Sequence, residues 1–462
     1  MNTLIYRLGL PILALIGSLS FADNCAAATR LWVANNGVDS PGCATITNPC
    51  RSISQAIENA NDGDTIFVGP GHYGDVSGHG TFSGPGDEHP QTFDDGDGCI
   101  VCITKPLHIY SVSGATVTVI AGPALPANAA AAWPADVEIL HDGVDFGYAG
   151  HGFTLTGGNG MGVEFNWGTV DGAGGGEKNM TVAGNIDLGD ATGFVYIGFP
   201  FTQPIFECPP QCTTARTVFS DNEALNNAVA GFKVTVNADV GPGLVILENN
   251  LALGGGGGFS VDGGAIRKGS PVIVATNIVQ LLNNVATQTA GVGFLAQLPG
   301  EISGNTASYN AVAGFLIVPT GGAVFEHNSA VGNGGPGVLI DWSQDDSTPV
   351  GGNFKTFSLN NLFGNDRNRP AIALAPGAQL IPSGYNPGPS AHCGILNIGA
   401  LAHPSGPPPA APLSANYDYW GAPSGPKASG AGDAIGGACD QNGGVTTARF
   451  PAATAYAVTT WP

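Results

Sequence analysis

A repeated spacing of polar and apolar residues runs through the middle of the chain. Seven asparagines are each followed, eight to ten residues later, by a glycine or alanine and then a large apolar residue. Successive asparagines are 21 to 37 residues apart. The asparagines are Asn185, Asn222, Asn250, Asn284, Asn305, Asn328 and Asn361, and the apolar partners are Phe194, Phe232, Phe259, Phe294, Phe315, Val338 and Ile372.

This pattern predicts a solenoid of short strands. A coil of 21 to 37 residues cannot bury its own apolar face, so successive coils stack about 4.8 Å apart and share one core. Asparagine tolerates the left-handed backbone of a sharp bend, and stacked asparagines can pass amide hydrogen bonds from coil to coil. The glycine permits the next corner, and the aromatic residue points inward. We therefore expect the asparagines to be structural.

The two ends of the repeat region resemble a known class. Residues 31–74 contain Leu-Trp-Val, then the segment 48–61, then Gly-Asp-Thr-Ile-Phe-Val-Gly-Pro-Gly-His-Tyr over 63–73. This resembles the opening module of right-handed parallel β-helix proteins of the pectin lyase-like class. Residues 416–426, Asn-Tyr-Asp-Tyr-Trp-Gly-Ala-Pro-Ser-Gly-Pro, resemble the closing turn of bacterial members. The resemblance implies fold and not function, because the class holds lyases, hydrolases, epimerases and non-enzymatic surface proteins.

The expected fold is therefore all-β, a single-stranded right-handed parallel β-helix with an N-terminal capping helix. Ile53, Ala56, Ile57 and Ala60 lie at helical spacing, so one face of a short helix would cover the open end of the core. Without such a cover, the end would expose strand edges.

The chain begins with the features of a secretory signal. Arg7 supplies a positive charge, the run 8–22 is apolar and short, and cleavage would fall after Ala22 or Ala28. We predict a signal peptide at 1–28, a β-helix domain at 29–440 and a C-terminal tail at 441–462 that packs on or beyond the last coil. No segment is long and apolar enough to predict a transmembrane helix, so a secreted or periplasmic protein is expected.

An even number of cysteines in the mature chain is what disulfide pairing in an oxidising compartment requires. Removal of Cys25 with the signal peptide leaves eight cysteines. Their spacing suggests that each one pairs with the cysteine next to it in the sequence. A redox role for the Cys-x-x-Cys pair is the alternative, but its surroundings read as strand, whereas reactive thiols favour helix N-termini. The predicted disulfides are Cys43–Cys50, Cys99–Cys102, Cys208–Cys212 and Cys393–Cys439.

The net charge of the chain limits the kinds of partner that it can bind. The formal net charge is −21, and only 14 Lys and Arg are present, so nucleic acid is excluded as a partner because phosphate binding needs a basic surface. The 72 glycines without a Gly-X-Y period fit many short strands and tight turns. We expect a monomer whose partner is a polysaccharide.

Strand alternation places specific residues on the outer face next to the inward phenylalanines. Asp262 and Asp341 are the candidate substrate-binding residues there. They lie three coils apart, about 14 Å, whereas a glycosidase pair needs roughly 5–9.5 Å. No catalytic residue can be assigned, because neither a polygalacturonase-like nor a pectate-lyase-like set of residues is present. The same face carries an apolar stripe, Leu295, Leu316 and Leu339, which we expect the C-terminal residues 375–462 to cover; a contact surface is the alternative.

The segment 76–98 is the candidate metal site. Asp94, Asp95 and Asp97 offer oxygen ligands, and the intervening glycines allow a tight wrap, which suits calcium. The alternative is a solvated turn, where aspartate and glycine are also common.

Three functions remain open. The first is a non-catalytic exported protein that contacts polysaccharide, the second is a polysaccharide lyase or glycoside hydrolase, and the third is a structural or assembly role. A shallow surface lined by exposed Trp or Tyr would favour carbohydrate contact. Carboxylates within about 9 Å of each other would favour an enzyme.

Overall fold

The structure is a computed structural model of the whole chain. It describes residues 28–76, 84, 86–92, 98–122, 135–157, 160–165, 179–198, 216–236, 244–262, 279–298, 300–319, 323–341, 354–366, 392–398, 413–422, 424–427, 432–435, 439 and 445–446. Residues 1–27 of the predicted signal peptide, the loop aspartates Asp94, Asp95 and Asp97, and Cys208 and Cys212 lie outside these residues.

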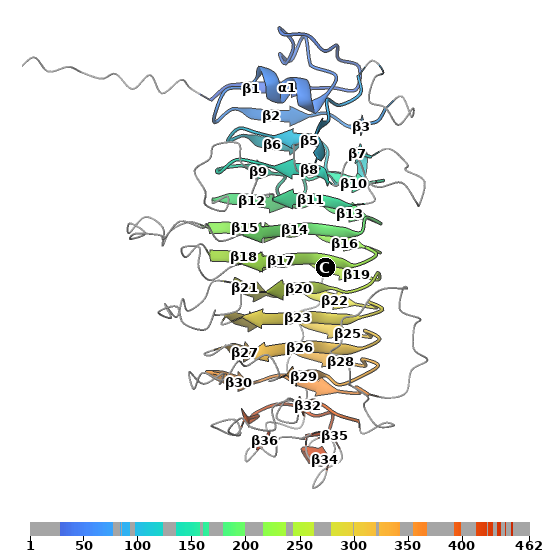
Figure 1. Cartoon of the computed structure of the whole chain (residues 1–462), viewed down its shortest axis with the longest axis vertical. Coiled ribbons are helices and arrows are strands. Elements are labelled where there is room, and N and C mark those ends of the chain that lie inside the picture. Colours follow the sequence, from blue (N-terminus) through green and yellow to red (C-terminus); the bar gives the residue numbers. More distant parts are fainter. Residues whose placement is uncertain are drawn as a thin grey trace, which may run out of the picture.

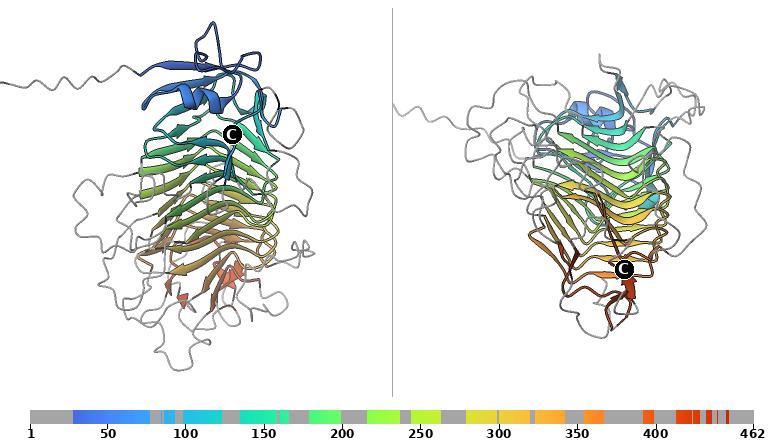
Figure 2. Two further views of the ribbon diagram at one scale, coloured as in Figure 1. Left: turned by 45° about the horizontal axis from the view of Figure 1, so that its top comes forward. Right: turned by 60° about the horizontal axis from the view of Figure 1, so that its bottom comes forward.

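Three long sheets wind around one core and form the stacked coils of a solenoid (Figures 1 and 2). The first sheet, among the described residues, has eleven parallel strands in the order β1 (Arg30–Val33), β2 (Thr65–Val68), β6 (His108–Ser111), β9 (Asp145–Phe146), β12 (Met180–Ala183), β15 (Arg216–Ser220), β18 (Leu244–Glu248), β21 (Val279–Leu282), β24 (Glu301–Ser303), β27 (Val324–Glu326) and β30 (Thr356–Ser358).

The second sheet follows the first along each coil. Its ten described strands are β3 (Gly71–Gly74), β7 (Thr118–Ala121), β10 (Thr154–Thr156), β13 (Ile186–Leu188), β16 (Glu223–Leu225), β19 (Leu251–Leu253), β22 (Val285–Thr287), β25 (Thr306–Ser308), β28 (Ser329–Val331) and β31 (Asn361–Phe363).

The third sheet closes each coil. Its described strands are β4 (Gln91–Thr92), β5 (Gly98–Ile103), β8 (Ala135–Ile139), β11 (Met161–Phe165), β14 (Thr192–Gly198), β17 (Ala230–Val236), β20 (Phe259–Asp262), β23 (Val292–Leu298), β26 (Ala313–Pro319), β29 (Val338–Asp341) and β32 (Ile395–Ile398). Only β4 pairs antiparallel among these strands. Two short pairs, β33 (Leu413–Ser414) with β36 (Val445–Thr446) and β34 (Pro426–Lys427) with β35 (Gly432–Ala434), lie near the C-terminal end. The all-β parallel solenoid predicted from the repeat is confirmed.

A stack of phenylalanine rings forms the centre of the core. Phe232, Phe259 and Phe294 are each 0–1% exposed, and neighbouring ring centroids lie 4.6 and 4.7 Å apart with nearly parallel planes. The rings of Phe194 and Phe315 extend the stack at 4.9 and 4.8 Å. The predicted inward positions and their register are therefore confirmed from coil to coil.

The glycine before each phenylalanine is required by packing. A Cβ on Gly258 would lie 2.3 Å from the carbonyl oxygen of Gly293 on the next coil and 2.7 Å from the Cβ of Ala286, which points inward from the second sheet. Gly258 does not have a positive φ. The prediction that this glycine permits a corner is therefore wrong here; it permits the close approach of the next coil and of the second sheet.

The asparagines form a hydrogen-bonded ladder inside the bend between the first and second sheets. The backbone N–H and Nδ2 of each one donate to Oδ1 of its equivalent on the next coil, at 2.8–3.3 Å. The ladder runs through Asn185, Asn222, Asn250, Asn284, Asn305, Asn328, Asn360 and Asp418.

Two details of the prediction are corrected. Asn360, and not Asn361, takes the seventh place, since Asn361 is a residue of strand β31. Its proposed partner Ile372 lies outside the described residues, and Ile395 follows Val338 in the core register. The residue with the left-handed backbone is the one before each ladder asparagine, such as Asn249 (φ 56°) and Asn283 (φ 55°). This residue turns the chain, and the asparagine that follows it then makes the ladder hydrogen bonds.

A second ladder was not predicted. Thr289, Asn310, Asn333, Asn365 and Asp433 are linked in the same way at the bend between the second and third sheets. Thr289, Asn310, Asn333 and Asn365 each stand five residues after a member of the first ladder, so the two ladders share coils but lie at different bends.

Helix α1 (Ile53–Asn59) lies at the N-terminal end of the solenoid, beside β1 and β2 (Figure 1). Ser52 Oγ accepts the N–H of Gln55, and Ile53, Ala56 and Ile57 are buried in the main core. Lys105 Nζ donates to the carbonyls of Ile57, Glu58 and Ala60 at 2.7–3.1 Å, which satisfies the C-terminal end of the helix. That α1 protects the end of the core stays a prediction.

Ile57→Asp tests this role. We expect it to lower the free energy of unfolding by several kcal/mol, because an unpaired carboxylate would be buried at a site that is 4% exposed. Thermal unfolding measures the effect, with Gln55→Asp, on a half-buried position of the same helix, as the control. An equal melting temperature for Ile57→Asp and the parent chain would show that α1 does not cover the core.

Three of the four predicted disulfides are present. Cys43–Cys50, Cys99–Cys102 and Cys393–Cys439 have Cα–Cα distances of 4.9, 5.5 and 5.6 Å. These distances are ordinary for disulfides. The fourth predicted pair falls outside the described residues and stays a prediction.

The predicted apolar stripe on the third sheet is buried at Leu316 and Leu339, while Leu295 is partly buried and packs against the same cluster. Leu316 and Leu339 are 2% and 0% exposed and cluster with Cys393, Ala434 and Cys439 from the C-terminal part of the chain. The expectation that this part covers the stripe is confirmed for these residues, and an exposed contact surface there is wrong. Among the described residues, no helix has the length and apolar character needed to span a membrane.

Candidate functional site

The two carboxylates predicted from the sequence do not converge. Asp262 is exposed at the end of β20, whereas Asp341 is 2% exposed at the end of β29. Gln297 and Val318 lie between them in the strand register, so two intervening coils separate them as predicted. Their role in substrate binding stays a prediction.

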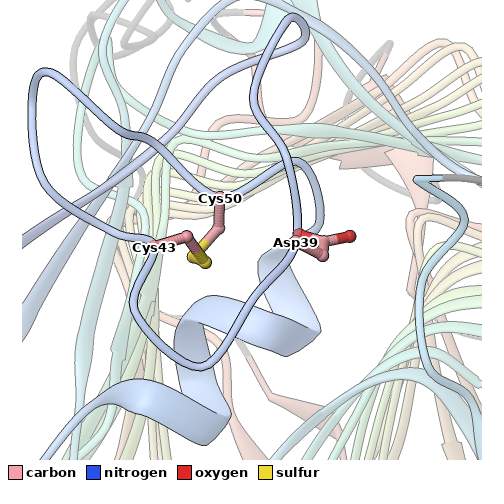
Figure 3. A group of neighbouring side chains, drawn as sticks. All are labelled: Asp39, Cys43 and Cys50. Carbon is pink, nitrogen blue, oxygen red and sulfur yellow. A yellow bond between two sulfur atoms is a disulfide. The ribbon is translucent and has the colours of Figure 1, made fainter.

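Metal-ligand geometry among the described residues is limited to one group. The side chains of Asp39, Cys43 and Cys50 lie close together near α1 (Figure 3). Both sulfurs are consumed by a disulfide, and Asp39 Oδ1 accepts the backbone N–H groups of Arg51 and Ser52 at 2.7 and 2.9 Å. This group therefore fixes the chain at the start of α1. The calcium site predicted at Asp94, Asp95 and Asp97 stays a prediction.

A row of aromatic side chains lies on the outer face of the first sheet. Trp32 (β1), Phe67 (β2) and Tyr110 (β6) occupy equivalent positions on three successive strands. All three are partly exposed, while their neighbours along each strand are buried in the core. Ring centroids are 5.1 Å apart for Trp32–Phe67 and 6.5 Å apart for Phe67–Tyr110.

The turn between β9 and β10 extends this row onto a fourth coil. Tyr148 is 43% exposed and packs edge-on against Tyr110 at 4.8 Å. The His151 ring stacks on Tyr148 at 4.3 Å, and its Nδ1 donates to the Ser111 carbonyl at 2.9 Å. We call Trp32, Phe67, Tyr110, Tyr148 and His151 the aromatic row. Cross-strand aromatic contacts stabilise a sheet, but they do not require that five rings remain open to water.

A polar column lies beside the aromatic row. It consists of Arg30, Thr65, His108, Asp145 and Thr181, which are equivalent positions on five successive strands. His108 Nδ1 donates to Asp145 Oδ2 at 2.7 Å, and the Tyr110 hydroxyl approaches the same oxygen at 3.4 Å. Burial, and then the nearby Asp145 carboxylate, raises the pKa of Tyr110, so its hydroxyl remains a hydrogen-bond donor.

Together, these two columns combine flat apolar surfaces with fixed hydrogen-bonding groups. Aromatic rings suit the apolar faces of sugar rings, and carboxylate, imidazole and hydroxyl groups suit sugar hydroxyls. The aromatic row was not predicted from the sequence, because the candidate residues were sought on the face next to the inward phenylalanines. The signal was present in Leu-Trp-Val, Ile-Phe-Val and Ile-Tyr-Ser, where an aromatic residue alternates with buried neighbours.

A second set of residues lies on the outer face of the third sheet. Glu138 (β8) and Glu164 (β11) are direct register partners, 1% and 4% exposed. Their strands are neighbours, so the two backbones are about 4.8 Å apart. Asp-Val-Glu-Ile and Gly-Val-Glu-Phe show the shared pattern that could have revealed them.

Other polar clusters are explained by structure. A cavity of about 290 Å³ beside α1 includes Glu58, His89 and Lys105, but Glu58 pairs with His89 at 3.0 Å and Lys105 holds the helix end. Inside the solenoid, Asp136 and Asp187 have raised pKa values, because both are buried and both face Asp190. These enclosed carboxylates have no surface from which to contact a polymer.

Comparison with known proteins gives little further guidance. No protein-family model matches the chain, and no curated protein matches it. A solved structure, the A-module of the Azotobacter vinelandii mannuronan C-5 epimerase AlgE6, is similar with a TM-score of 0.38 and 17% identity. The match covers 68% of this chain and 81% of that chain. The function of this chain is therefore inferred from its own residues.

Proposed function

We propose that the protein binds a polysaccharide through the aromatic row. The observation that carries the proposal is the alignment of five partly exposed aromatic side chains over four coils, beside a column of hydrogen-bonding groups. An extended polymer fits this surface better than a small molecule, because the row is open and long. The three disulfides are compatible with a secreted or periplasmic location, which is part of the proposal.

Removal of single rings tests the binding surface. We expect Trp32→Ala and Phe67→Ala each to weaken binding about tenfold or more, since aromatic anchors at a binding surface contribute about 2 kcal/mol. Affinity gel electrophoresis with a panel of soluble polysaccharides measures the change in mobility.

The matched control is Tyr309→Ala. Tyr309 is 46% exposed and lies in a turn of a distant coil, so its loss should leave binding unchanged. Melting temperatures establish that all three variants are folded. Retention of full affinity by folded Trp32→Ala and Phe67→Ala would refute the proposed surface.

A further inference from the structure

The aromatic row and the polar column share one direction. Strands β1, β2 and β6 each contribute one residue to the row and one to the column, so both sets run from strand to strand, parallel to the long axis of the solenoid (Figure 1). Along a single strand, by contrast, Trp32 is the only aromatic side chain of β1 on the outer face. A polymer that crossed the sheet along the strands would stack on one ring, whereas a polymer along the axis would meet one ring per coil.

We infer that the ligand of this surface is an uncharged polysaccharide that lies along the solenoid axis, with its sugar rings on the aromatic row and its hydroxyls on the polar column. The inference rests on the proposed function and specifies the class of polymer and its orientation.

The charges of the surface select against acidic polymers. Asp145 is the fourth of the five residues of the polar column, and Arg30, at the other end of this column, is the one permanent cation among the described residues of the two sets. The whole chain carries a formal charge of −21. A carboxylated or sulfated polymer along the axis would place its anions beside Asp145, while a neutral polymer would place hydroxyl donors there.

The fixed geometry of Asp145 supports hydroxyl recognition. The hydrogen bond from His108 Nδ1 orients the imidazole, so its Nε2 remains for a partner outside the protein. Thr65 and Thr181 flank this pair on the neighbouring strands and are partly exposed. The column therefore presents acceptors and donors at successive coils, which matches a polymer with hydroxyls on every sugar.

Polymer charge is the first test. Hydroxyethylcellulose, galactomannan, xyloglucan and a soluble β-1,3-glucan are compared with carboxymethylcellulose, alginate and polygalacturonate by affinity electrophoresis. Binding of at least one neutral polymer that Trp32→Ala weakens about tenfold supports the inference. Binding of acidic polymers alone, with the same dependence on Trp32, overturns the inference but keeps the proposed function. No Trp32-dependent binding to any polymer overturns both.

The role of Asp145 gives a second readout. We expect Asp145→Asn to strengthen binding of an acidic polymer about fivefold relative to its effect on a neutral one, since two like charges about 4 Å apart cost about 1 kcal/mol in water. Carboxymethylcellulose and hydroxyethylcellulose share a backbone, so they form the matched pair. An equal effect of Asp145→Asn on both polymers would show that this carboxylate does not select by charge.

Oligosaccharide length tests the orientation. From Trp32 to Tyr148 the row spans four coils, or about 14 Å at the coil spacing, which is the length of three to four sugars. Calorimetry is carried out with oligosaccharides of increasing length from the polymer that binds. The affinity should rise with each added sugar up to three or four sugars and change less than about twofold for longer oligosaccharides. A plateau at one or two sugars would instead place the polymer across the row and overturn the axial orientation.

Discussion

Asn284→Ala is expected to lower the free energy of unfolding by about 3–5 kcal/mol. The Asn284 side chain accepts from the N–H and Nδ2 of Asn250 and donates to the carbonyl of Leu247 and to Asn305 Oδ1, all at 2.8–3.0 Å. Alanine removes these four hydrogen bonds from buried groups, and each buried group left unsatisfied costs about 1–3 kcal/mol. Asn250 Nδ2 keeps its bond to the Phe219 carbonyl, and Asn305 Oδ1 keeps the backbone N–H of residue 284, so the loss stays below the sum of four full penalties. Denaturant unfolding measures the change.

The control is the residue directly before it. Asn283 is exposed and has φ 55°, a conformation that glycine adopts freely, so Asn283→Gly should change the unfolding free energy by less than about 1 kcal/mol. Similar losses in Asn284→Ala and Asn283→Gly would mean that the bend, and not the ladder, holds the coils together.

Asp418→Asn is expected to stabilise the protein at pH 8 by about 2–4 kcal/mol and to have little effect at pH 4. Asp418 takes the last place of the asparagine ladder, where its Oδ1 accepts the N–H and Nδ2 of Asn360 at 2.8 and 2.9 Å. Burial raises its pKa to about 7, although the hydrogen bonds from Asn360 oppose the shift. Its second oxygen has no hydrogen-bond partner.

The sign of the pH dependence follows from this shift. Between the ordinary aspartate pKa of about 4 and the folded value, the folded chain holds a proton that the unfolded chain has released, so stability falls as pH rises. Three pKa units correspond to about 4 kcal/mol, and the loss is complete above about pH 7. Asparagine keeps the acceptor oxygen without the charge, so it removes this loss.

Unfolding curves at pH 4 and pH 8 measure the difference. Asp62→Asn, on an exposed turn, removes one negative charge from the surface and serves as the control for general charge repulsion. If Asp418→Asn and Asp62→Asn change stability equally at pH 8, or if Asp418→Asn acts equally at both pH values, Asp418 is not the source of a pH-dependent cost.

The sequence by itself determined the class of fold. Each coil repeats the same local requirements, an asparagine at a bend and an inward phenylalanine such as Phe259, so the period is visible in spite of insertions. It also determined the disulfides between near neighbours, Cys43–Cys50 and Cys99–Cys102, because short separations leave few alternatives. The buried face of α1 could also be predicted, because the helical spacing of Ile53, Ala56 and Ile57 is a local feature of the sequence.

Only the tertiary structure decided which coils align. Insertions vary the coil length, so the register could not be counted along the chain; this is why Asn360 replaced Asn361 in the ladder. Trp32, Phe67 and Tyr110 are 35 and 43 residues apart, yet strand pairing sets them in one line on the surface. Alternation within a strand tells which side chains point outward, but stacking between strands decides which of them meet. The candidate binding surface is made entirely by that second step.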